Sequence, residues 1–423
     1  MDDATLDIRE AARARAWSEP LETLSPAQAE LFAADAMWPY FERLRAEDPV
    51  HWTPDSPYGP YWSLTLYNDI MAVETNHQDF SSASGIVLQS LKQTEEEGRR
   101  SARPSFISMD PPEHDKQRKT VSPVVAPTNL QNLSPVIRER AGAILDALPI
   151  GEEFDWVDKV SKELTAMTLA TLFGFPYEQR RSLTFWSDMF TNSVGHGPVT
   201  SWEQKQAEIA NCFAAFDELR EARLKAEPTF DLVSMLVHGE ATRDLDIHAY
   251  HGNLVLLIIG GNDTTRNTIS GSVYALNKFP DEYDNLRAGP ELIPSMVSET
   301  IRWQTPLAHM RRTALRDVEF RGKTIREGDK VVMWYVSGNR DETVIDSPNA
   351  YIIDRARPRQ HLSFGFGIHR CVGNRLAELQ LTIIWEEILR RFPEIRLAGE
   401  PTRTYSTFIK GYETLPVIIP RRN

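Results

Sequence analysis

The sequence predicts one mainly α-helical domain with a small β region. Segments in which apolar residues recur every three or four positions are long and numerous, whereas alternating segments are short and few. No Pro-, Gly- or Ser-rich linker interrupts the 423 residues, and 41% of them are hydrophobic, which is enough to bury a large core. We therefore expect residues 1–423 to form a single domain, in which roughly residues 1–40 are an N-terminal extension.

The same periodicities predict the individual elements. Long helices are expected over residues 129–148, 158–173, 202–226, 250–278 and 374–392. Strands are expected over 61–67, in two halves of 318–336 joined by a turn at Glu327-Gly328, and in a final hairpin over 402–420. The helices outnumber the strands, which cluster toward the two ends of the chain.

Composition argues against several classes of protein. The net charge of −13 disfavours general nucleic-acid binding, because a phosphate backbone requires a broad basic surface. The N-terminal region lacks the apolar core of a signal peptide, and the most apolar stretch, residues 254–259, is far too short to cross a bilayer. With only two cysteines, Cys212 and Cys371, no disulfide framework is implied. We expect a soluble cytoplasmic protein with no membrane span and no nucleic-acid partner.

One of the cysteines lies in a glycine-punctuated loop, Phe364–Gly373, just before the predicted helix 374–392. A cysteine in this place sits near the positive end of the helix dipole, near backbone N–H donors and beside Arg370, and all three lower the pKa of a thiol. Three glycines allow the backbone to turn tightly and to approach a large flat ligand: Gly365, Gly367 and Gly373. The pattern indicates a Cys371 thiolate, although a free cysteine is usually just a small buried hydrophobe.

A second cluster, Gly260-Gly261-Asn262-Asp263-Thr264-Thr265, falls inside the helix predicted over 250–278. Two adjacent helical glycines cost about 1 kcal/mol each relative to alanine, so their presence indicates that space is needed there. Gly260 and Thr264 are four residues apart and share one helix face, so the missing side chain opens a notch beside a hydroxyl, with the Asp263 carboxyl next to it. Taken alone, the glycine pair is also typical of a kink or a close helix contact.

A helix start is predicted at Asp110-Pro111-Pro112-Glu113. Asp110 is expected as the N-cap, proline at the first helical position, and Glu113 at N3, reaching back as in a capping box. His114 and Arg118 then follow at i,i+4 spacing on one face, where both are able to donate to a buried carboxylate. The alternative for each of them is a solvated charged helix face.

The cysteine loop resembles the heme-binding loop of cytochrome P450 enzymes, F-G-x-G-x-H-x-C-x-G, at every fixed position. The cluster at 260–265 is similar to the oxygen-binding motif of the same family, [A/G]-G-x-[D/E]-T-T. The resemblance implies the triangular, α-rich P450 fold with a long central helix and a small β region, and heme b as the cofactor. It implies that Cys371 is the axial ligand of the heme iron. The other heme-binding members of the loop would be Phe364, Gly365, His369 and Gly373.

By the same resemblance, the Gly260 notch admits O2 over the iron, Thr264 hydrogen-bonds the bound oxygen, and Asp263 relays protons from solvent. Positioned proton delivery is typically worth about a hundred- to ten-thousandfold in rate. The family's patterns also imply four donors to the two heme propionates, which would neutralise the anionic edge of the cofactor: His114, Arg118, Arg312 and His369. Arg311 is an adjacent competitor of Arg312 for this role.

Glu299-Thr300-Ile301-Arg302 resembles the family's E-x-x-R motif, a buried structural ion pair completed by an arginine in the segment before the heme loop. On an exposed helix such a pair would be worth only a few tenths of a kcal/mol, about 0.3. The sequence departs from the usual pattern because Ala350 occupies the place where that arginine aligns. Arg355 is the candidate for the third member.

Position relative to these motifs predicts the residues that face the substrate: Leu256, Ile259, Leu307 and Phe408. The loop around residues 86–91 is expected to help to close the pocket. An apolar stripe at helical spacing is more often ordinary core than pocket, and that alternative stands for each of these residues. A pocket with this lining implies an apolar small-molecule substrate.

Two longer strings refine the resemblance, GGNDTTRNTISG and HLSFGFGIHRCVGNRLAELQL. They look most like the soluble bacterial P450 hydroxylases that oxidise the terminal carbon of medium-chain alkanes and fatty acids. The terpenoid and steroid hydroxylases, whose oxygen-helix motifs are similar, are a close alternative.

The predicted function is therefore an O2-dependent monooxygenase. The sequence contains no flavin or iron–sulfur module, so its electrons are expected from ferredoxin and ferredoxin reductase. A basic patch near the cysteine suits an acidic ferredoxin, although plain surface is the alternative: Lys116, Arg118, Lys119, Arg370 and Arg375. Two other classes stay open, a heme-thiolate sensor or electron-transfer protein and a peroxygenase that uses H2O2 directly. The Asp263-Thr264 pair argues against both.

Overall fold

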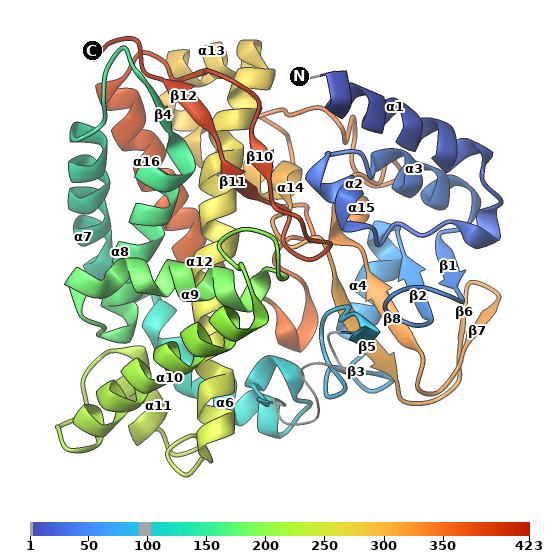
Figure 1. Cartoon of the computed structure of the whole chain (residues 1–423), viewed down its shortest axis with the longest axis horizontal. Coiled ribbons are helices and arrows are strands. Elements are labelled where there is room, and N and C mark those ends of the chain that lie inside the picture. Colours follow the sequence, from blue (N-terminus) through green and yellow to red (C-terminus); the bar gives the residue numbers. More distant parts are fainter. Residues whose placement is uncertain (1–2, 93–102) are drawn as a thin grey trace.

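A computed structural model describes residues 3–92 and 103–423 and has the mainly helical architecture expected of the sequence (Figure 1). One long helix, α12 (Ile247–Lys278), runs through the middle of the molecule. Further helices cover one side of it, and the largest sheet lies on the other side with the N-terminal helices (Figure 1). The predicted fold class is confirmed.

The other helices follow in chain order: α1 (Asp3–Ser18), α2 (Ala29–Ala33), α3 (Trp38–Glu47), α4 (Tyr67–Thr75), α6 (Glu113–Val121), α7 (Pro127–Asp146), α8 (Lys162–Phe173), α9 (Arg180–Thr191), α10 (Trp202–Leu224), α11 (Leu232–His238), α13 (Pro280–Ala288), α14 (Ile293–Gln304), α15 (Tyr335–Gly338) and α16 (Asn374–Arg391). The five helices predicted from periodicity correspond to α7, α8, α10, α12 and α16. A π-helical turn, Val157–Ser161, precedes α8 and forms the first part of the segment predicted as one helix.

The largest sheet has the strand order β1-β2-β8-β5-β3. Its strands are β1 (Val50–Thr53), β2 (Tyr61–Leu64), β3 (Phe80–Ser81), β5 (Met310–Ala314) and β8 (Lys330–Met333). Smaller sheets pair β6 (Val318–Phe320) with β7 (Lys323–Ile325), β10 (Thr402–Arg403) with β11 (Tyr412–Thr414), and β12 (Pro416–Ile418) with both β4 (Glu153–Asp155) and β9 (Arg396–Leu397). The strand predicted over 61–67 ends at Leu64, because Tyr67 already begins α4.

The turn predicted at Glu327-Gly328 is present between β7 and β8, but the segment before it is two strands and not one. Arg321 and Gly322 have positive φ of 48° and 74°, and two consecutive left-handed residues close a tight hairpin between β6 and β7. The Glu327-Gly328 turn leads into β8, which pairs in parallel with β2 and antiparallel with β5. The tail is only partly the predicted hairpin, since β12 pairs with the distant β4 and not with its neighbour β11.

The predicted capping box at Asp110 is also wrong. The first helical residue of α6 is Glu113, and its N-cap, Pro112, has no side-chain cap. The Asp110 carboxylate accepts hydrogen bonds from the Ser81 hydroxyl and, at 3.1 Å, from the Ser82 N–H. Because Asp110 is already bound to β3, it joins the sheet to the start of α6 and does not cap the helix.

Close packing fixes α12 at the centre of the fold, where it contacts α8, α9, α14 and α16. A Cβ on Gly261 would lie 2.7 Å from the Leu169 methyl of α8, and one on Gly271 would lie 2.6 Å from the Gln304 side chain of α14. These glycines let neighbouring helices approach. Within residues 3–92 and 103–423, none of the helices combines the length and apolarity that a bilayer-spanning segment requires.

Candidate active site

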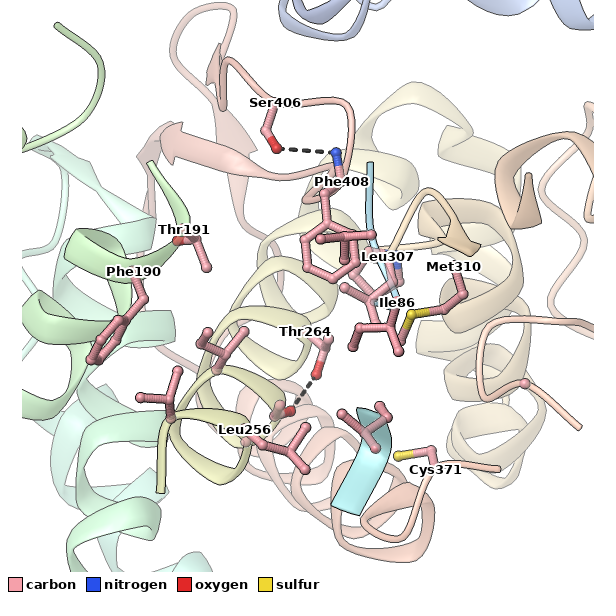
Figure 2. A pocket seen from close by; sticks show the side chains of 18 of the residues that line it. Ile86, Phe190, Thr191, Leu256, Thr264, Leu307, Met310, Cys371, Ser406 and Phe408 are labelled. Carbon is pink, nitrogen blue, oxygen red and sulfur yellow. Dashed lines mark hydrogen bonds between the residues drawn. The ribbon is translucent and has the colours of Figure 1, made fainter. Parts of the chain in front are cut away.

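A cavity of about 1080 Å³ lies between α12, the cysteine loop and β5. Figure 2 shows Cys371 at one end of this cavity, with Phe408 and Ser406 at the other end. All four residues predicted to face a substrate line it: Leu256, Ile259, Leu307 and Phe408. The loop predicted to help to close the pocket contributes Ile86, Val87 and Leu88.

Cys371 follows the short 3-10 turn Gly367–His369, and its N–H donates to the Phe364 carbonyl at 2.8 Å. The side chain has substantial accessible area because it faces the cavity, while the surrounding protein shields it from bulk water. This desolvation raises the pKa of the Cys371 thiol, against the lowering effect of the Gly373 N–H, Arg118 and Arg370. The electropositive surroundings are thus as expected, but the predicted net lowering is wrong for the protein alone. A coordinated cation deprotonates such a thiol outright.

The tight turn expected of the loop glycines is present, and two of them also pack against a neighbouring helix. Gly365 and Gly367 have φ of 63° and 65°, and both backbones press against Glu74 of α4. A Cβ on Gly365 would lie 3.0 Å from Glu74 Oε2, and one on Gly367 would overlap the Glu74 carbonyl oxygen. Of the three loop glycines, Gly373 has open space where a side chain would be, since no atom of the described residues lies within 4 Å of its Cβ position.

Four donors predicted to bind an anionic group gather near this loop. Arg118, Arg312 and His369 line the cavity, and the His114 and His369 rings are 4.4 Å apart. Among residues 3–92 and 103–423, the buried His114 Nε2 and His369 Nδ1 have no hydrogen-bond partner. Burial, together with the charges of Arg312, His114 and Arg118, lowers the pKa of His369 to about 2. With Arg118 and Arg312 nearby, these rings can add donors for a buried anionic group: His369 through Nδ1, and His114 through Nε2 when its ring is protonated, because His114 Nδ1 already donates to Asp115 at 2.7 Å.

The structure distinguishes Arg312 from its neighbour Arg311. Arg312 is 3% exposed and faces the cavity from β5. Arg311 points toward the preceding loop, where its guanidinium donates to the Ser84 carbonyl and lies 3.5 Å from the Val87 carbonyl. Alternation of side chains along β5 therefore places only Arg312 at the site.

The notch predicted in α12 is present. A Cβ on Gly260 would meet no atom of the described part of the chain within 4 Å, and the Thr264 hydroxyl donates to the Gly260 carbonyl at 2.8 Å (Figure 2). Both residues line the cavity above Cys371. The alternative explanation of the glycine pair, a close helix contact, applies to Gly261, which packs against Leu169.

Asp263, expected beside the notch, lies on the other side of α12 and is fully buried away from the cavity. Its carboxylate accepts from Arg266 at 2.8 Å, Asn262 at 2.9 Å and the Ser187 hydroxyl at 3.1 Å. Burial raises the pKa of Asp263 to about 6, while Arg266 opposes this and the Asp188 charge adds to it.

The contacts of Asp263 continue toward the surface through α9. Arg266 also donates to Asp188 Oδ1 at 2.9 Å, and Lys162, which is about a quarter exposed, lies 3.4 Å from Asp188 Oδ2. Burial followed by the Asp188 charge raises the pKa of the nearby Glu413. A chain of titratable and charged groups thus joins Asp263 to solvent.

Glu299 and Arg302 of α14 are completely buried and form a two-pronged pair at 2.7 and 2.8 Å. Arg355 donates to both oxygens of the same carboxylate, at 3.1 and 3.2 Å. Ala350, where the family's arginine would align, contributes its carbonyl, which accepts from Arg302 at 2.9 Å. The network ties α14 to the segment that leads to the cysteine loop.

Sequence reasoning missed two polar residues that shape the cavity. His309 is fully buried, accepts from the Leu88 N–H at 3.1 Å through Nε2, and donates to the Thr407 carbonyl at 2.9 Å through Nδ1. Burial lowers the pKa of His309 to about 4, so the ring is neutral and joins the two loops that close the cavity. Glu74 is the other; its partners lie more than 200 residues away, and no local pattern marks it.

Comparison with known proteins agrees with this site. The cytochrome P450 family model matches residues 290–405. The chain is 36% identical over 396 residues to linalool 8-monooxygenase of Pseudomonas putida, covering 92% of this chain and 97% of that protein. It is 30% identical over 394 residues to the methyl-branched lipid omega-hydroxylase of Mycobacterium tuberculosis, covering 89% and 90%. The solved structure of cytochrome P450-153 from Novosphingobium aromaticivorans superposes with a TM-score of 0.85 at 44% identity, covering 94% of this chain and 99% of that one.

The chain therefore belongs to the cytochrome P450 family. It is a monooxygenase of hydroxylase type, and the family's cofactor is heme, bound through a cysteine thiolate. The cavity fits this group: a thiol faces it from the loop at one end, and unpaired buried nitrogens with two arginines lie beside that loop. Enzymes of this family use O2 and a redox partner.

Proposed function

We propose that this protein hydroxylates the terminal carbon of medium-chain alkanes or fatty acids, with electrons from ferredoxin and ferredoxin reductase. The observation that carries the proposal is an apolar part of the wall of the cavity that Cys371 faces, formed by Leu256, Ile259 and Leu307, which we propose acts as a throat. Two further observations support the proposal. The strings GGNDTTRNTISG and HLSFGFGIHRCVGNRLAELQL resemble those of terminal hydroxylases, and the chain is similar to a protein named as a methyl-branched lipid omega-hydroxylase.

In this proposal, the whole chain acts as a single heme-bearing domain. Cys371 ligates the iron, with Phe364, Gly365, Gly373 and Gly260 around the heme, and bound heme supplies the activation of O2 and the transfer of oxygen into a C–H bond. The propionates are held by His114, Arg118, Arg312 and His369. Within the described residues His369 Nδ1 and His114 Nε2 are unpaired, which supports these last assignments, because a propionate would accept from His369 Nδ1 and from Nε2 of a protonated His114.

Thr264 and Asp263 are proposed to deliver protons to the site. The Thr264 hydroxyl lines the cavity, whereas Asp263 lies behind the helix and connects to solvent through Arg266 and Asp188. The pKa of Asp263, raised to about 6, suits a group that passes protons near neutral pH. Because Thr264 rests on the Gly260 carbonyl at 2.8 Å, its hydroxyl has to rotate to donate toward the cavity.

The proposed ferredoxin site is the face that carries Lys116, Lys119, Arg370 and Arg375, all of which are exposed. Glu113 pairs with Lys116 at 2.7 Å, so the patch is not uniformly basic. Long-range attraction of an acidic partner depends on the summed charge and weakens with salt.

Terminal selectivity has to come from the throat, since a terminal methyl C–H bond is stronger than the neighbouring methylene bonds. Leu307 forms an isolated β-bridge with Ile409, and the Ala308 N–H donates to the Phe408 carbonyl at 2.8 Å. These backbone bonds fix Leu307 and Phe408 against each other over the cavity (Figure 2). A fixed apolar wall favours a linear chain end, and one methylene of misfit is worth about 1–3 kcal/mol.

The second candidate function is hydroxylation of a terpenoid or a steroid. The identity of 36% to a linalool 8-monooxygenase favours it. It differs from the first proposal in the shape of substrate that the throat admits, not in the chemistry of the heme.

The test is product analysis with the reconstituted system, using octane, a medium-chain fatty acid, linalool and a steroid. Wild type is expected to form mainly primary alcohols from the linear substrates. Leu307→Ala should retain turnover but shift the product about tenfold toward subterminal alcohols, at 1.4 kcal/mol per tenfold. Leu389→Ala on α16, the same truncation outside the cavity, is the control.

Mainly secondary alcohols from wild type, or faster oxidation of linalool or the steroid, would replace the first candidate by the second. Equal product formation with H2O2 alone would indicate a peroxygenase. A protein that binds heme but yields no product under either condition would be a sensor or an electron-transfer protein.

A further inference from the structure

A buried acid, Glu74, lies directly behind the cysteine loop. It belongs to the last turn of α4, is 3% exposed and contributes to the cavity wall. Its carboxylate accepts hydrogen bonds from three separate parts of the chain: the Phe366 N–H at 2.8 Å, the Tyr335 hydroxyl at 2.5 Å and Arg312 at 3.4 Å. A carboxylate with three donors has the partners that its ionised form requires.

The cysteine loop is built around this residue. The N–H of Phe366 points at Glu74 Oε2, and the left-handed glycines on either side, Gly365 and Gly367, bring the loop against its carboxylate and its carbonyl. A side chain at Gly367 would overlap the Glu74 backbone. The position of the loop, and hence of Cys371, therefore depends on Glu74.

Glu74 also places a carboxyl group beside Arg312 and Tyr335 in the wall of the cavity. Arg312 divides its donors between the Glu74 carboxylate at 3.4 Å and the Arg311 carbonyl at 2.9 Å. The same carboxylate, with burial as the larger cause, raises the pKa of Tyr335 well above its usual value, so Tyr335 stays a neutral donor. The Glu74 carboxyl group thus lies inside the wall of the cavity with three donors, of which Arg312 is the one positive charge.

We propose that Glu74 is a positioning residue for the cysteine loop, and that its buried negative charge lowers the reduction potential of the heme held by Cys371. Adding an electron to the ferric iron increases negative charge, so a fixed anion nearby disfavours the ferrous form. The effect persists because the surroundings of Glu74 exclude water and therefore screen the charge weakly. The inference rests on the proposed ligation by Cys371.

The experiment compares Glu74→Gln with wild type by spectroelectrochemical titration of the one-electron ferric/ferrous couple. Glutamine keeps the size and one acceptor oxygen while removing the charge. We expect the equilibrium to shift at least tenfold toward the ferrous form, an increase of about 59 mV for a one-electron couple. Glu74→Asp, which keeps the charge, should shift it less than about threefold, or about 28 mV.

Glu387→Gln is the matched control. Glu387 is as deeply buried and is paired with Arg138 at 2.9 Å, but it lies on α16 away from the cavity. Its replacement should leave the potential unchanged whatever it does to stability. If Glu74 had a purely structural role, Glu74→Gln would change the stability of the protein but leave the reduction potential of the heme unchanged.

Tyr335→Phe provides a test that does not depend on folding of the glutamine variant. Removing the hydroxyl leaves the Glu74 charge less compensated, so the reduction potential should fall. The ferric/ferrous equilibrium should shift by about two- to threefold toward the ferric form. An unchanged potential in Glu74→Gln, or in Tyr335→Phe if the first variant binds no heme, would overturn the inference. The strongly red-shifted Soret band of reduced wild type with CO tests Cys371 ligation separately, since its absence would overturn the proposed function instead.

Discussion

Replacing Gly260 by alanine should make the protein more stable while narrowing the active site. Gly260 is in the middle of α12, and its Cβ position is open to the cavity, with nothing within 4 Å. Alanine removes the entropic penalty of a helical glycine, about 0.8–1 kcal/mol, and no neighbouring atom has to move. The free energy of unfolding should therefore rise by about 1 kcal/mol.

The adjacent glycine, Gly261, is a matched control, because the same substitution there should not raise the free energy of unfolding. An alanine Cβ at Gly261 would lie 2.7 Å from the Leu169 Cδ2 methyl. Overpacking of this kind costs about 1–3 kcal/mol, which equals or exceeds the propensity gain of about 1 kcal/mol. Gly261→Ala should thus have between no effect and a loss of about 2 kcal/mol, because the flexible Leu169 side chain absorbs part of the clash.

Both variants are measured by urea unfolding of the heme-bound protein and by product ratio with a linear substrate. An unfolding entropy of about 2.1 cal/mol/K per residue makes 1 kcal/mol worth only about 1 °C in Tm for a chain of this size, so the denaturant midpoint is the better readout. Gly260→Ala should change the product ratio, since the new methyl enters the cavity beside Thr264. A Gly260→Ala protein less stable than Gly261→Ala would refute the assignment of the two glycines to cavity and helix contact.

Two further predictions concern the buried charges. Arg355→Ala should lower the free energy of unfolding by about 1–3 kcal/mol, the range for a lost hydrogen bond to a charged group, because the buried Glu299 then keeps only Arg302 and the Ile352 N–H as donors. Arg355→Lys should recover part of this loss, and a loss below about 0.5 kcal/mol would contradict the network. The pKa of Asp263 is raised from 3.8 to about 6, so its protonated fraction falls as pH rises through that value. If Asp263 donates the proton, the product formed per electron pair by wild type should fall as the pH rises from about 5 to 7. In Asp263→Asn this yield should be lower and independent of pH, while substrate binding is unchanged. A variant whose yield kept the pH dependence of wild type would exclude this role.

Much of the site was predictable because its chemistry is encoded locally. Gly260 and Thr264 share a helix face by their spacing alone, and the structure places both on the cavity. The residues from Phe364 to Gly373 form a continuous loop, so the approach of Arg370 and the helix start to Cys371 follows from sequence adjacency. The five long helices follow from apolar periodicity in the same way.

What lies behind these residues could not be predicted, because it depends on partners far apart in the chain. Spacing puts Asp263 one residue from Thr264, but only packing against α9 turns its carboxyl toward Ser187 and away from the cavity. The same reason applies to Glu74, whose partner Phe366 in the cysteine loop is 292 positions away, and to the parallel pairing of β8 with β2, which no local pattern indicates. A sequence determines which residues share a helix face or a turn. Burial, and with it the pKa of Asp263 and the electrostatic environment of Cys371, is decided by the elements that pack around them.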